Sequence, residues 1–316
     1  MAIRKVILFL TLSFGIVFML PAQPAGVKIP ADTGELETVL NKANNGSSSE
    51  KGMNRYIIGY CCQNGILTEK DIEAALIWYN KSTAYNYVPA WLAKAQIFED
   101  MDKPFMYMRA YYEAAVLGSD TAEKELEQIF SEDEDIIAGH YLARLYRKRM
   151  DMEKFIPVAY SNASAGDIAI QADLGYYLMN GCGGDREMFL EGLNLYENAA
   201  ATDSVSVMHN LADSFGLPYD DDGLRIWYGD QAQEALVSIW YGLGMLYLSG
   251  TKYTQADPQK GVVLLLKAAE GNNTMAMEEL VKCYSEGLGV KKDPDKAEYW
   301  SGKIEESDNY QYYFGF

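Results

Sequence analysis

The chain has 316 residues, of which 49% are hydrophobic and 13% aromatic, and its formal net charge is −18 at pH 7. This composition is sufficient for a packed core. The acidic charge argues against binding to nucleic acid or to anionic membranes, because both kinds of binding rest on lysine and arginine at phosphate groups. We therefore expect a folded protein without a nucleic-acid partner, whose surface suits a protein partner with a basic surface.

The N-terminus has the pattern of a secretory signal peptide. Arg4 and Lys5 precede a 15-residue apolar run from Val6 to Leu20, and small residues follow, the first of them at Ala22. The apolar run is short for a membrane span. We expect residues 1–22 to be cleaved, which predicts a periplasmic or extracellular protein without membrane insertion. An uncleaved anchor is the alternative.

Residues 23–52 contain the stretch NKANNGSSSEKG, which is rich in asparagine, serine and glycine. Such a composition is typical of flexible linkers. The sequence therefore predicts a flexible leader between the signal peptide and the folded part.

An internal repeat begins after this leader. A shift of 36 residues places the Asp-Pro pair at Asp257 over the pair at Asp293. A column of mostly small residues recurs at spacings of 32 to 37 residues, with one interval of 49: Ser82, Ala114, Ala163, Ala199, Gln231, Ala268 and Ile304. A period of this length predicts an all-α solenoid of helix pairs. The long interval predicts an additional helix near Ile136 to Lys148.

A second column consists of eight-residue segments that end on glycine. The segments are IGYCCQNG, LGYYLMNG, LGMLYLSG and LVKCYSEG, which end at Gly65, Gly181, Gly250 and Gly287. Their first, second and fifth positions are apolar or small, which marks one face of a helix. The glycine stands where a helix end needs a left-handed residue. We therefore expect each segment to be the end of the first helix of a pair.

The stretch KGVVLLLKAAEGNNTMAMEELVKCYSEGLGVKKDPDKAEYW resembles the Sel-one-like repeat (SLR) family, a relative of the tetratricopeptide repeats. The resemblance is clearest over Asp257–Trp300. It implies a right-handed α-solenoid of antiparallel helix pairs, with about seven degenerate repeats over residues 53–305. It also implies a scaffold or adaptor role without catalysis. We expect the aromatic tail at 306–316 to cover the end of the core.

Motifs for other functions are incomplete. Gly287 and Gly289 suggest a phosphate loop, but a P-loop needs GxxxxGK[ST] after a strand. Asp293 before Pro294 is the expected start of a helix. The aspartates at 220–222 lack the alternating ligand pattern of a calcium loop. We therefore predict no metal and no cofactor.

The sequence also has few of the residues that a catalytic triad or a histidine-rich metal site needs, since only two histidines occur in the chain. Ser48 and Lys51 match the S-x-x-K motif of penicillin-recognising enzymes, but they lie in the predicted leader. We therefore expect no catalytic residue. The alternatives left open are a hydrolase of cell-wall material or β-lactams, like cysteine-rich SLR relatives, and a solenoid that binds carbohydrate or peptide.

Four cysteines occur, at Cys61, Cys62, Cys182 and Cys283. Some secreted SLR proteins carry one disulfide per repeat. Here the cysteines fall in non-adjacent repeats, while neighbouring helices are already 8–10 Å apart and a disulfide needs Cα atoms within about 7 Å. We therefore predict free thiols.

Helical geometry predicts a binding face. One leucine recurs in each first helix and is expected to face the core: Leu142, Leu174, Leu211, Leu243 and Leu280. Positions two residues before and after it point the opposite way, towards the concave surface that binds partners in solenoids. The predicted partner-binding residues are His140, Arg144, Tyr176, His209, Asp213, Tyr241, Met245, Glu278 and Lys282. The alternative is that these are simply solvated positions. The expected function is an exported, non-enzymatic protein that binds another protein in a bacterial envelope.

Overall fold

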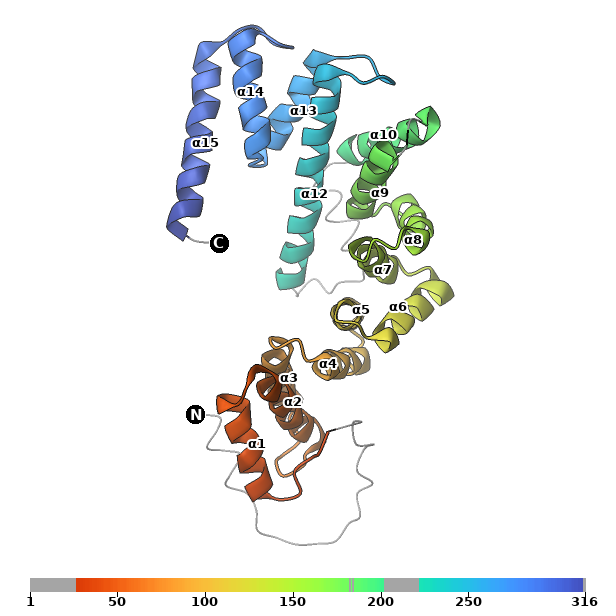
Figure 1. The fold of residues 1–316 in the computed structure, drawn as a ribbon, viewed down its shortest axis with the longest axis vertical. Helices are drawn as coiled ribbons and strands as arrows, with labels where there is room; N and C mark the ends of the chain where they lie inside the picture. Colours follow the sequence, from red (N-terminus) through yellow and green to blue (C-terminus); the bar gives the residue numbers. More distant parts are fainter. Residues whose placement is uncertain (1–26, 182, 184, 202–221, 315–316) are drawn as a thin grey trace. The chain divides into compact units, whose positions relative to one another are not determined.

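The computed structural model describes residues 27–181, 183, 185–201 and 222–314, with the backbone alone at 133, 222–232 and 308–314. The predicted signal peptide, Cys182, His209, Leu211 and Asp213 lie outside the described residues, as does most of the acidic stretch at 220–222. The regular structure of the described ranges is α-helical, as the repeat pattern predicts (Figure 1).

The helices follow one another with short connections. In chain order they are α1 (Thr33–Asn45), α2 (Ser48–Asn64), α3 (Ile72–Thr83), α4 (Val88–Asp100), α5 (Pro104–Val116), α6 (Asp120–Asp133), α7 (Ile136–Lys148), α8 (Met152–Ser164), α9 (Ile168–Gly181), α10 (Arg186–Ala201), α12 (Asp222–Ser249), α13 (Pro258–Glu270), α14 (Thr274–Glu286) and α15 (Pro294–Phe314). Helix α7 coincides with the additional helix predicted from the long interval. The chain divides between Leu145 and Tyr146 into two compact units, each described by itself below.

The predicted flexible leader is wrong, because most of it is helical. Asp32 accepts a hydrogen bond from the backbone N–H of Glu35 at 2.8 Å and begins α1. Ser47 and Glu50 form a capping box that begins α2. Ala43 of α1 is fully buried in the core of the first unit. The polar residues of this segment therefore include the caps of two packed helices, whose role composition alone does not reveal.

The first unit is built around the pairs α2–α3 and α4–α5, whose helices pack against each other. Tyrosines fill much of the first core: the ring of Tyr56 lies 5.6 Å from that of Tyr79 and 5.5 Å from that of Tyr87. Tyr79 is fully buried, and its hydroxyl donates to Gln63 at 2.6 Å. Burial of these large rings is the main stabilising contribution available to a helix pair of this size.

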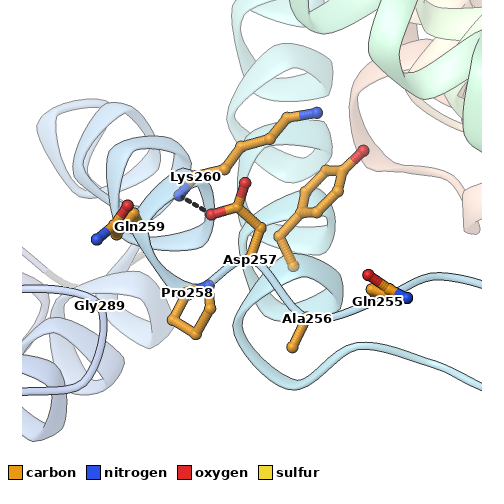
Figure 2. Close-up of a pocket in the computed structure, with 8 residues that line it drawn as sticks. Gln255, Ala256, Asp257, Pro258, Gln259, Lys260 and Gly289 are labelled. Atoms are coloured by element: carbon orange, nitrogen blue, oxygen red, sulfur yellow. Dashed lines mark hydrogen bonds between the residues drawn. The ribbon is translucent and has the colours of Figure 1, made fainter.

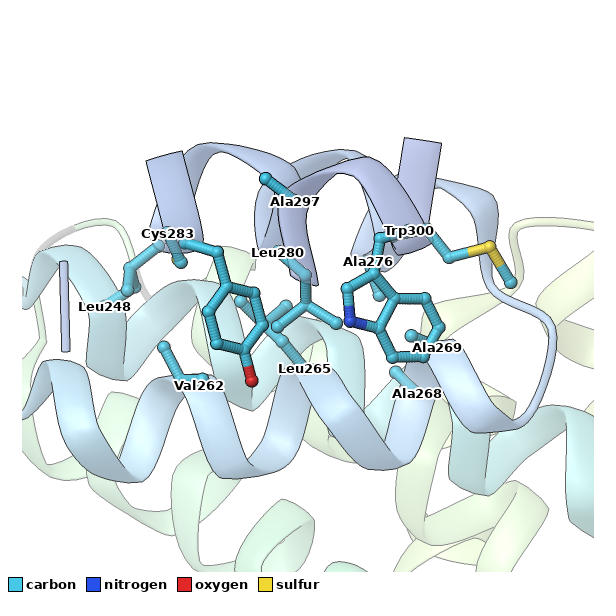
Figure 3. Close-up of a cluster of buried hydrophobic side chains, with 12 residues drawn as sticks. Leu248, Val262, Leu265, Ala268, Ala269, Ala276, Leu280, Cys283, Ala297 and Trp300 are labelled. Carbon is cyan, nitrogen blue, oxygen red and sulfur yellow. The ribbon is translucent and has the colours of Figure 1, made fainter. Parts of the chain in front are cut away.

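The second unit contains the pairs α9–α10, α12–α13 and α14–α15. Figure 3 shows how its C-terminal core is filled by Leu265 from α13, Leu280 from α14 and Trp300 from α15. The predicted core leucines are confirmed wherever the structure describes them, since none is more than 1% exposed: Leu142, Leu174, Leu243 and Leu280.

Small residues allow the paired helices to approach closely. A Cβ atom added to Gly261 of α13 would lie 2.9 Å from the carbonyl oxygen of Gly244 in α12. A Cβ on Gly192 of α10 would lie 2.7 Å from the carbonyl oxygen of Gly175 in α9. Gly175 and Gly244 are the second residues of two of the glycine-ending segments. Their recurrence is therefore explained by backbone contact between the two helices of a pair.

The predicted helix ends are confirmed at three glycines. Gly65, Gly250 and Gly287 follow α2, α12 and α14 with φ of 68°, 69° and 81°, and each donates its N–H to the carbonyl four residues earlier. Gly181 differs, because α9 runs through it and the left-handed residue is Gly183, with φ of 54°. The prediction at Gly181 is therefore wrong by two residues, in a stretch that offers several glycines.

Two further boundaries differ from the prediction. Gln231 and Leu243 were expected in separate helices, but both lie in the continuous helix α12. The sequence between them, AQEALVSIWYG, has no proline and no glycine or asparagine until Gly242, so no residue favours a break. The tail predicted at 306–316 is, as far as Phe314, the continuation of α15.

Candidate protein-binding surface

The predicted partner-binding residues of the second unit lie on three helices. Tyr176 of α9 is 59% exposed. Glu278 and Lys282 of α14 are exposed, and Lys282 pairs with Glu279 at 2.7 Å. These three positions face solvent, as helical geometry predicts.

Tyr241 and Met245 of α12 are half-buried and pack against the C-terminal core. The pKa of Lys282 is raised, chiefly by its hydrogen bond to Glu279 and to a smaller extent by the proximity of Tyr241. Tyr241 and Lys282 therefore lie near each other although they come from different helices, and α9 also contacts α12. We call the set of Tyr176, Tyr241, Met245, Glu278 and Lys282 the first-helix surface.

The prediction is wrong for His140, which is 1% exposed. Its ring meets that of Tyr141 edge-on at 5.5 Å. Residues 137–143 of α7 are all buried, so this helix is covered on more than the one side that its leucine marks. Arg144 is half-buried, with its guanidinium carbon 5.9 Å from the ring centre of Tyr112.

A polar cluster that the sequence did not predict joins three helices of the second unit. Glu197 of α10 accepts hydrogen bonds from the hydroxyl of Tyr247 in α12 and from the ammonium of Lys260 in α13, the latter at 2.8 Å. The same ammonium lies 3.9 Å from the ring centre of Tyr247. We call these three residues the Glu197 cluster.

Each charge in the Glu197 cluster has a partner. Burial alone would raise the pKa of Glu197, but the hydrogen bonds from Lys260 and Tyr247 outweigh it, and the pKa is lowered. Burial would lower the pKa of Lys260, but the bonds to Glu197 and Tyr247 raise it. The two ions therefore stabilise each other's charged form, and the cluster serves to join α10, α12 and α13.

A pocket of about 620 Å³ lies beside this cluster, between the end of α12, the start of α13 and Gly289 (Figure 2). Asp257, one of the lining residues, accepts a hydrogen bond from the backbone N–H of Lys260 at 3.0 Å, as the cap of α13. A Cβ on Gly289 would lie 2.2 Å from the carbonyl oxygen of Pro258, and its φ is 70°. Gly289 is therefore required for the close approach of its connector to the start of α13. Because Asp257 already accepts a backbone N–H at this helix start, that N–H is not available to a phosphate group.

The Gly287 to Pro294 connector has the predicted construction. Gly287 ends α14, Asp293 accepts the backbone N–H of Lys296 at 3.2 Å, and Pro294 is the first residue of α15. The motif that suggested a phosphate loop is the turn between two helices.

A model of the Sel1 repeat matches three segments, residues 55–84, 241–273 and 275–304. The chain carries Sel1 repeats. Such repeats generally mediate protein interaction. No protein with a curated description is recognisably similar to the chain in sequence.

Two solved structures are similar to the chain at low identity. A Sel1 repeat protein from Oxalobacter formigenes is 19% identical, over 86% of this chain and 99% of the other, with a TM-score of 0.39. A protective antigen with an SLR fold, present in uropathogenic Escherichia coli strains, is 18% identical over 85% and 79% of the two chains, with a TM-score of 0.27. These values do not bear on the function of the chain.

The Sel1 repeats coincide with described helix pairs. The first segment contains most of α2 and all of α3, the second the end of α12 with α13, and the third nearly all of α14 and the first half of α15. The residues of α12 and α14 on the first-helix surface therefore belong to recognised repeats, and Tyr176 lies outside them.

The thiols in these repeats are free and buried, as predicted for Cys61, Cys62 and Cys283. Burial, together with the neighbouring Cys62, raises the pKa of Cys61 to about 12. Burial and the nearby Asp71 raise the pKa of Cys62 to about 11. Such thiols are poor nucleophiles at neutral pH.

Ser48 lies in the first turn of α2 and is exposed, which corrects its predicted place in an unstructured leader. The adjacent Ser47, and not Ser48, caps the helix. Within the described residues, no group of three or more histidine, cysteine, aspartate or glutamate side chains is placed to hold a metal ion. The described helices also include none with the length and apolar character of a membrane span.

Proposed function

We propose that the chain is an exported, non-enzymatic Sel1-repeat protein of a bacterial envelope, which acts as a scaffold or adaptor and holds a protein partner on the first-helix surface. The single observation that carries the surface assignment is Tyr176, a large aromatic side chain that is 59% exposed on α9. Tyrosine offers a large contact area at a low cost in conformational entropy, and exposed apolar groups of this size mark interaction sites when they cluster.

The other residues of the first-helix surface support the proposal. Tyr241 and Met245 supply apolar area that is anchored in the core beneath, and Glu278 and Lys282 supply charges on α14. An apolar centre beside charged residues is the usual composition of a protein interface. Export rests on the signal-peptide pattern of the first 22 residues.

The test is capture of a partner by the tagged, exported chain from an envelope extract. We expect a defined protein to be retained by the wild type and by Tyr299→Ala, and to be lost by Tyr176→Ala. Tyr299 is a matched control because it is 57% exposed on α15 and lies outside the first-helix surface. Equal recovery by the two variants would refute the surface assignment.

The mass of the exported protein tests the export separately, and a mass that still contains residues 1–20 would contradict cleavage. The hydrolase alternative is tested with nitrocefin. Turnover by the purified chain that disappears in Ser48→Ala would replace the scaffold proposal with an enzymatic one.

A further inference from the structure

Helix α15 carries a glycine, Gly302, on its exposed side. An added Cβ at this position would meet no atom of the described residues within 4 Å. Glycine inside a helix is unfavourable relative to alanine, and it is usually found there where another group approaches closely. The described fold of a single chain therefore gives no reason for Gly302.

Elsewhere in the chain, helix glycines make room for a tyrosine ring of the neighbouring helix. A Cβ on Gly59 of α2 would lie 2.7 Å from a ring carbon of Tyr79 in α3. A Cβ on Gly175 of α9 would lie 2.7 Å from a ring carbon of Tyr196 in α10. Two helix pairs of this chain thus use the same contact, a tyrosine ring packed on a glycine.

The exposed face of α15 carries both halves of this contact. Tyr299 precedes Gly302 by three residues, which places the two side by side on one face of the helix, and Tyr299 is 57% exposed. A depression of about 440 Å³ follows this face, and its lining residues are Asp295, Glu298, Tyr299, Gly302, Lys303 and Glu306. A face that offers both the ring and the gap is complementary to itself under a two-fold rotation.

The charges of this face fit the same rotation. When two antiparallel helices place Tyr299 opposite Gly302, Glu298 comes opposite Lys303. Among the described residues Glu298 forms no ion pair, whereas Lys303 pairs with Glu306 at 2.8 Å and its ammonium lies 6.0 Å from the ring centre of Tyr299. The rotation therefore brings a cation to Glu298 in the register that the ring and the glycine already require.

We propose that α15 binds α15 of a second copy of the chain in an antiparallel, two-fold symmetric contact. Tyr299 of each copy packs on Gly302 of the other, and Glu298 of each copy pairs with Lys303 of the other. This inference goes beyond the proposed function, because the first-helix surface takes no part in the contact.

The dimer is expected to be weak. One pair of helices buries less than the roughly 1,200–2,000 Å² of a stable interface. The net charge of −18 on each copy opposes association, and the same register brings Asp295 opposite Glu306 at the ends of the contact. We therefore expect a dissociation constant on the order of 100 µM.

The test is sedimentation equilibrium of the purified exported chain, from about 10 µM to about 1 mM. We expect a monomer–dimer equilibrium whose dissociation constant rises about tenfold in Tyr299→Ala and in Gly302→Ala. Because alanine favours helix, weaker association of Gly302→Ala is not a result of lost folding. Met275→Ala is the matched control, since Met275 is 53% exposed on α14 and lies outside the α15 face, and it should leave the equilibrium unchanged.

Reversal of the charges tests the register. Glu298→Lys and Lys303→Glu should each dimerise about tenfold more weakly than the wild type, because each variant places like charges opposite each other. An equimolar mixture of the two should associate about as strongly as the wild type, since every pair in the mixed dimer then has opposite charges. Labelling of one variant with a fluorophore allows the mixed dimer to be followed by sedimentation.

A folded wild type that stays monomeric up to about 1 mM overturns the proposal. So does equal weakening by Met275→Ala and Tyr299→Ala, or a mixture of the charge variants that associates no better than its components. A monomeric wild type whose captured protein is lost in Tyr299→Ala would assign the α15 face to a different protein. Capture from an extract uses the chain far below 100 µM, where it is monomeric, so this proposal and the first-helix surface fail separately.

Discussion

The Glu197 cluster of the second unit and a second polar cluster in the first unit differ in how their polar groups are matched. The second cluster consists of Lys94 of α4 and Tyr141 of α7, with Arg109 and Glu113 of α5 acting electrostatically on both. In the Glu197 cluster one carboxylate receives both an ammonium and a phenolic hydroxyl. In the second cluster the half-buried Lys94 forms no ion pair, and the buried hydroxyl of Tyr141 forms no hydrogen bond, among the described residues. A polar group packed between helices stabilises the fold when it has a partner, and costs folding free energy when it has none.

The largest expected effect comes from forcing α12 and α13 apart, because the Glu197 cluster depends on their close approach. In Gly261→Ala the new Cβ would lie 2.8 Å from the backbone nitrogen of Leu248, which cannot move without its helix. We expect a loss of about 2 kcal/mol in the free energy of unfolding, even though alanine favours helix. Urea denaturation followed by circular dichroism measures it.

Gly302→Ala is the control for this experiment. Gly302 lies in α15, and an added Cβ would meet no atom within 4 Å. We expect this variant to be more stable than the wild type by about 0.5–1 kcal/mol, through helix propensity alone. Destabilisation of similar size in both variants would contradict the close-contact explanation.

Removing one hydroxyl from each cluster compares them directly. Tyr247→Phe deletes a hydrogen bond to the charged Glu197 and should cost about 1 kcal/mol, since the carboxylate keeps Lys260 as a partner. Tyr141→Phe deletes a hydroxyl that has no hydrogen-bond partner among the described residues, so the free energy of unfolding should be unchanged or slightly higher. Thermal unfolding of the two variants side by side measures both changes in stability. A loss of stability in Tyr141→Phe as large as that in Tyr247→Phe would contradict the distinction between the two clusters.

The pH dependence of stability reports on the buried charge of Lys94. The pKa of Lys94 in the folded chain is lowered to about 8 from a usual value of 10.5, so the folded state releases its proton first as pH rises. Below pH 8 the fold carries the full cost of the buried charge. Between pH 8 and 10.5 the unfolded state binds more protons, so this residue's contribution to stability rises with pH.

We therefore expect Lys94→Met to be more stable than the wild type at pH 7, by about 1 kcal/mol after screening by solvent. The difference should shrink between pH 8 and pH 9.5, before the tyrosines ionise. Melting temperatures of both proteins across this range test the prediction. A difference that stays constant with pH would show that Lys94 is not the titrating group.

Much of the fold could be predicted from the sequence, because its signals are local. Gly287, Asp293 and Pro294 each favour one backbone conformation, and the structure uses all three as the sequence predicts. Helix α1 and the start of α2 were missed because asparagine and serine are common both in linkers and in helix caps. The decisive signal was the spacing of Ser47 and Glu50 in a capping box.

The binding residues were harder to predict, because they depend on contacts between helices. The position of a single leucine indicates only one buried side of a helix. The side opposite this leucine is exposed at Tyr176, as predicted, but it is buried at His140, because α7 is buried on more than one side. Lys94 and Tyr141 come from helices far apart in sequence, so no local pattern joins them. The sequence signal at Lys94 is a tryptophan three residues earlier. The same spacing occurs at Lys81 and Lys303, and it does not tell the exposed Lys81 from the half-buried Lys94.

The smallest expected effect is at Lys260, where the ion pair of the Glu197 cluster meets solvent. The side chains of Lys260 and Glu197 are 46% and 40% exposed, so their attraction is screened by water and salt. Lys260→Met keeps the aliphatic contact with Tyr247 and should cost only about 0.2–1 kcal/mol at low ionic strength. The difference from the wild type should diminish further in 1 M salt, where the screening length is about 3 Å. Thermal denaturation of both proteins at low ionic strength and in 1 M sodium chloride measures this difference in stability. A larger, salt-independent loss would mean that the charge pair is effectively buried, and that the Glu197 cluster contributes more to the contact between α10 and α13 than its exposure indicates.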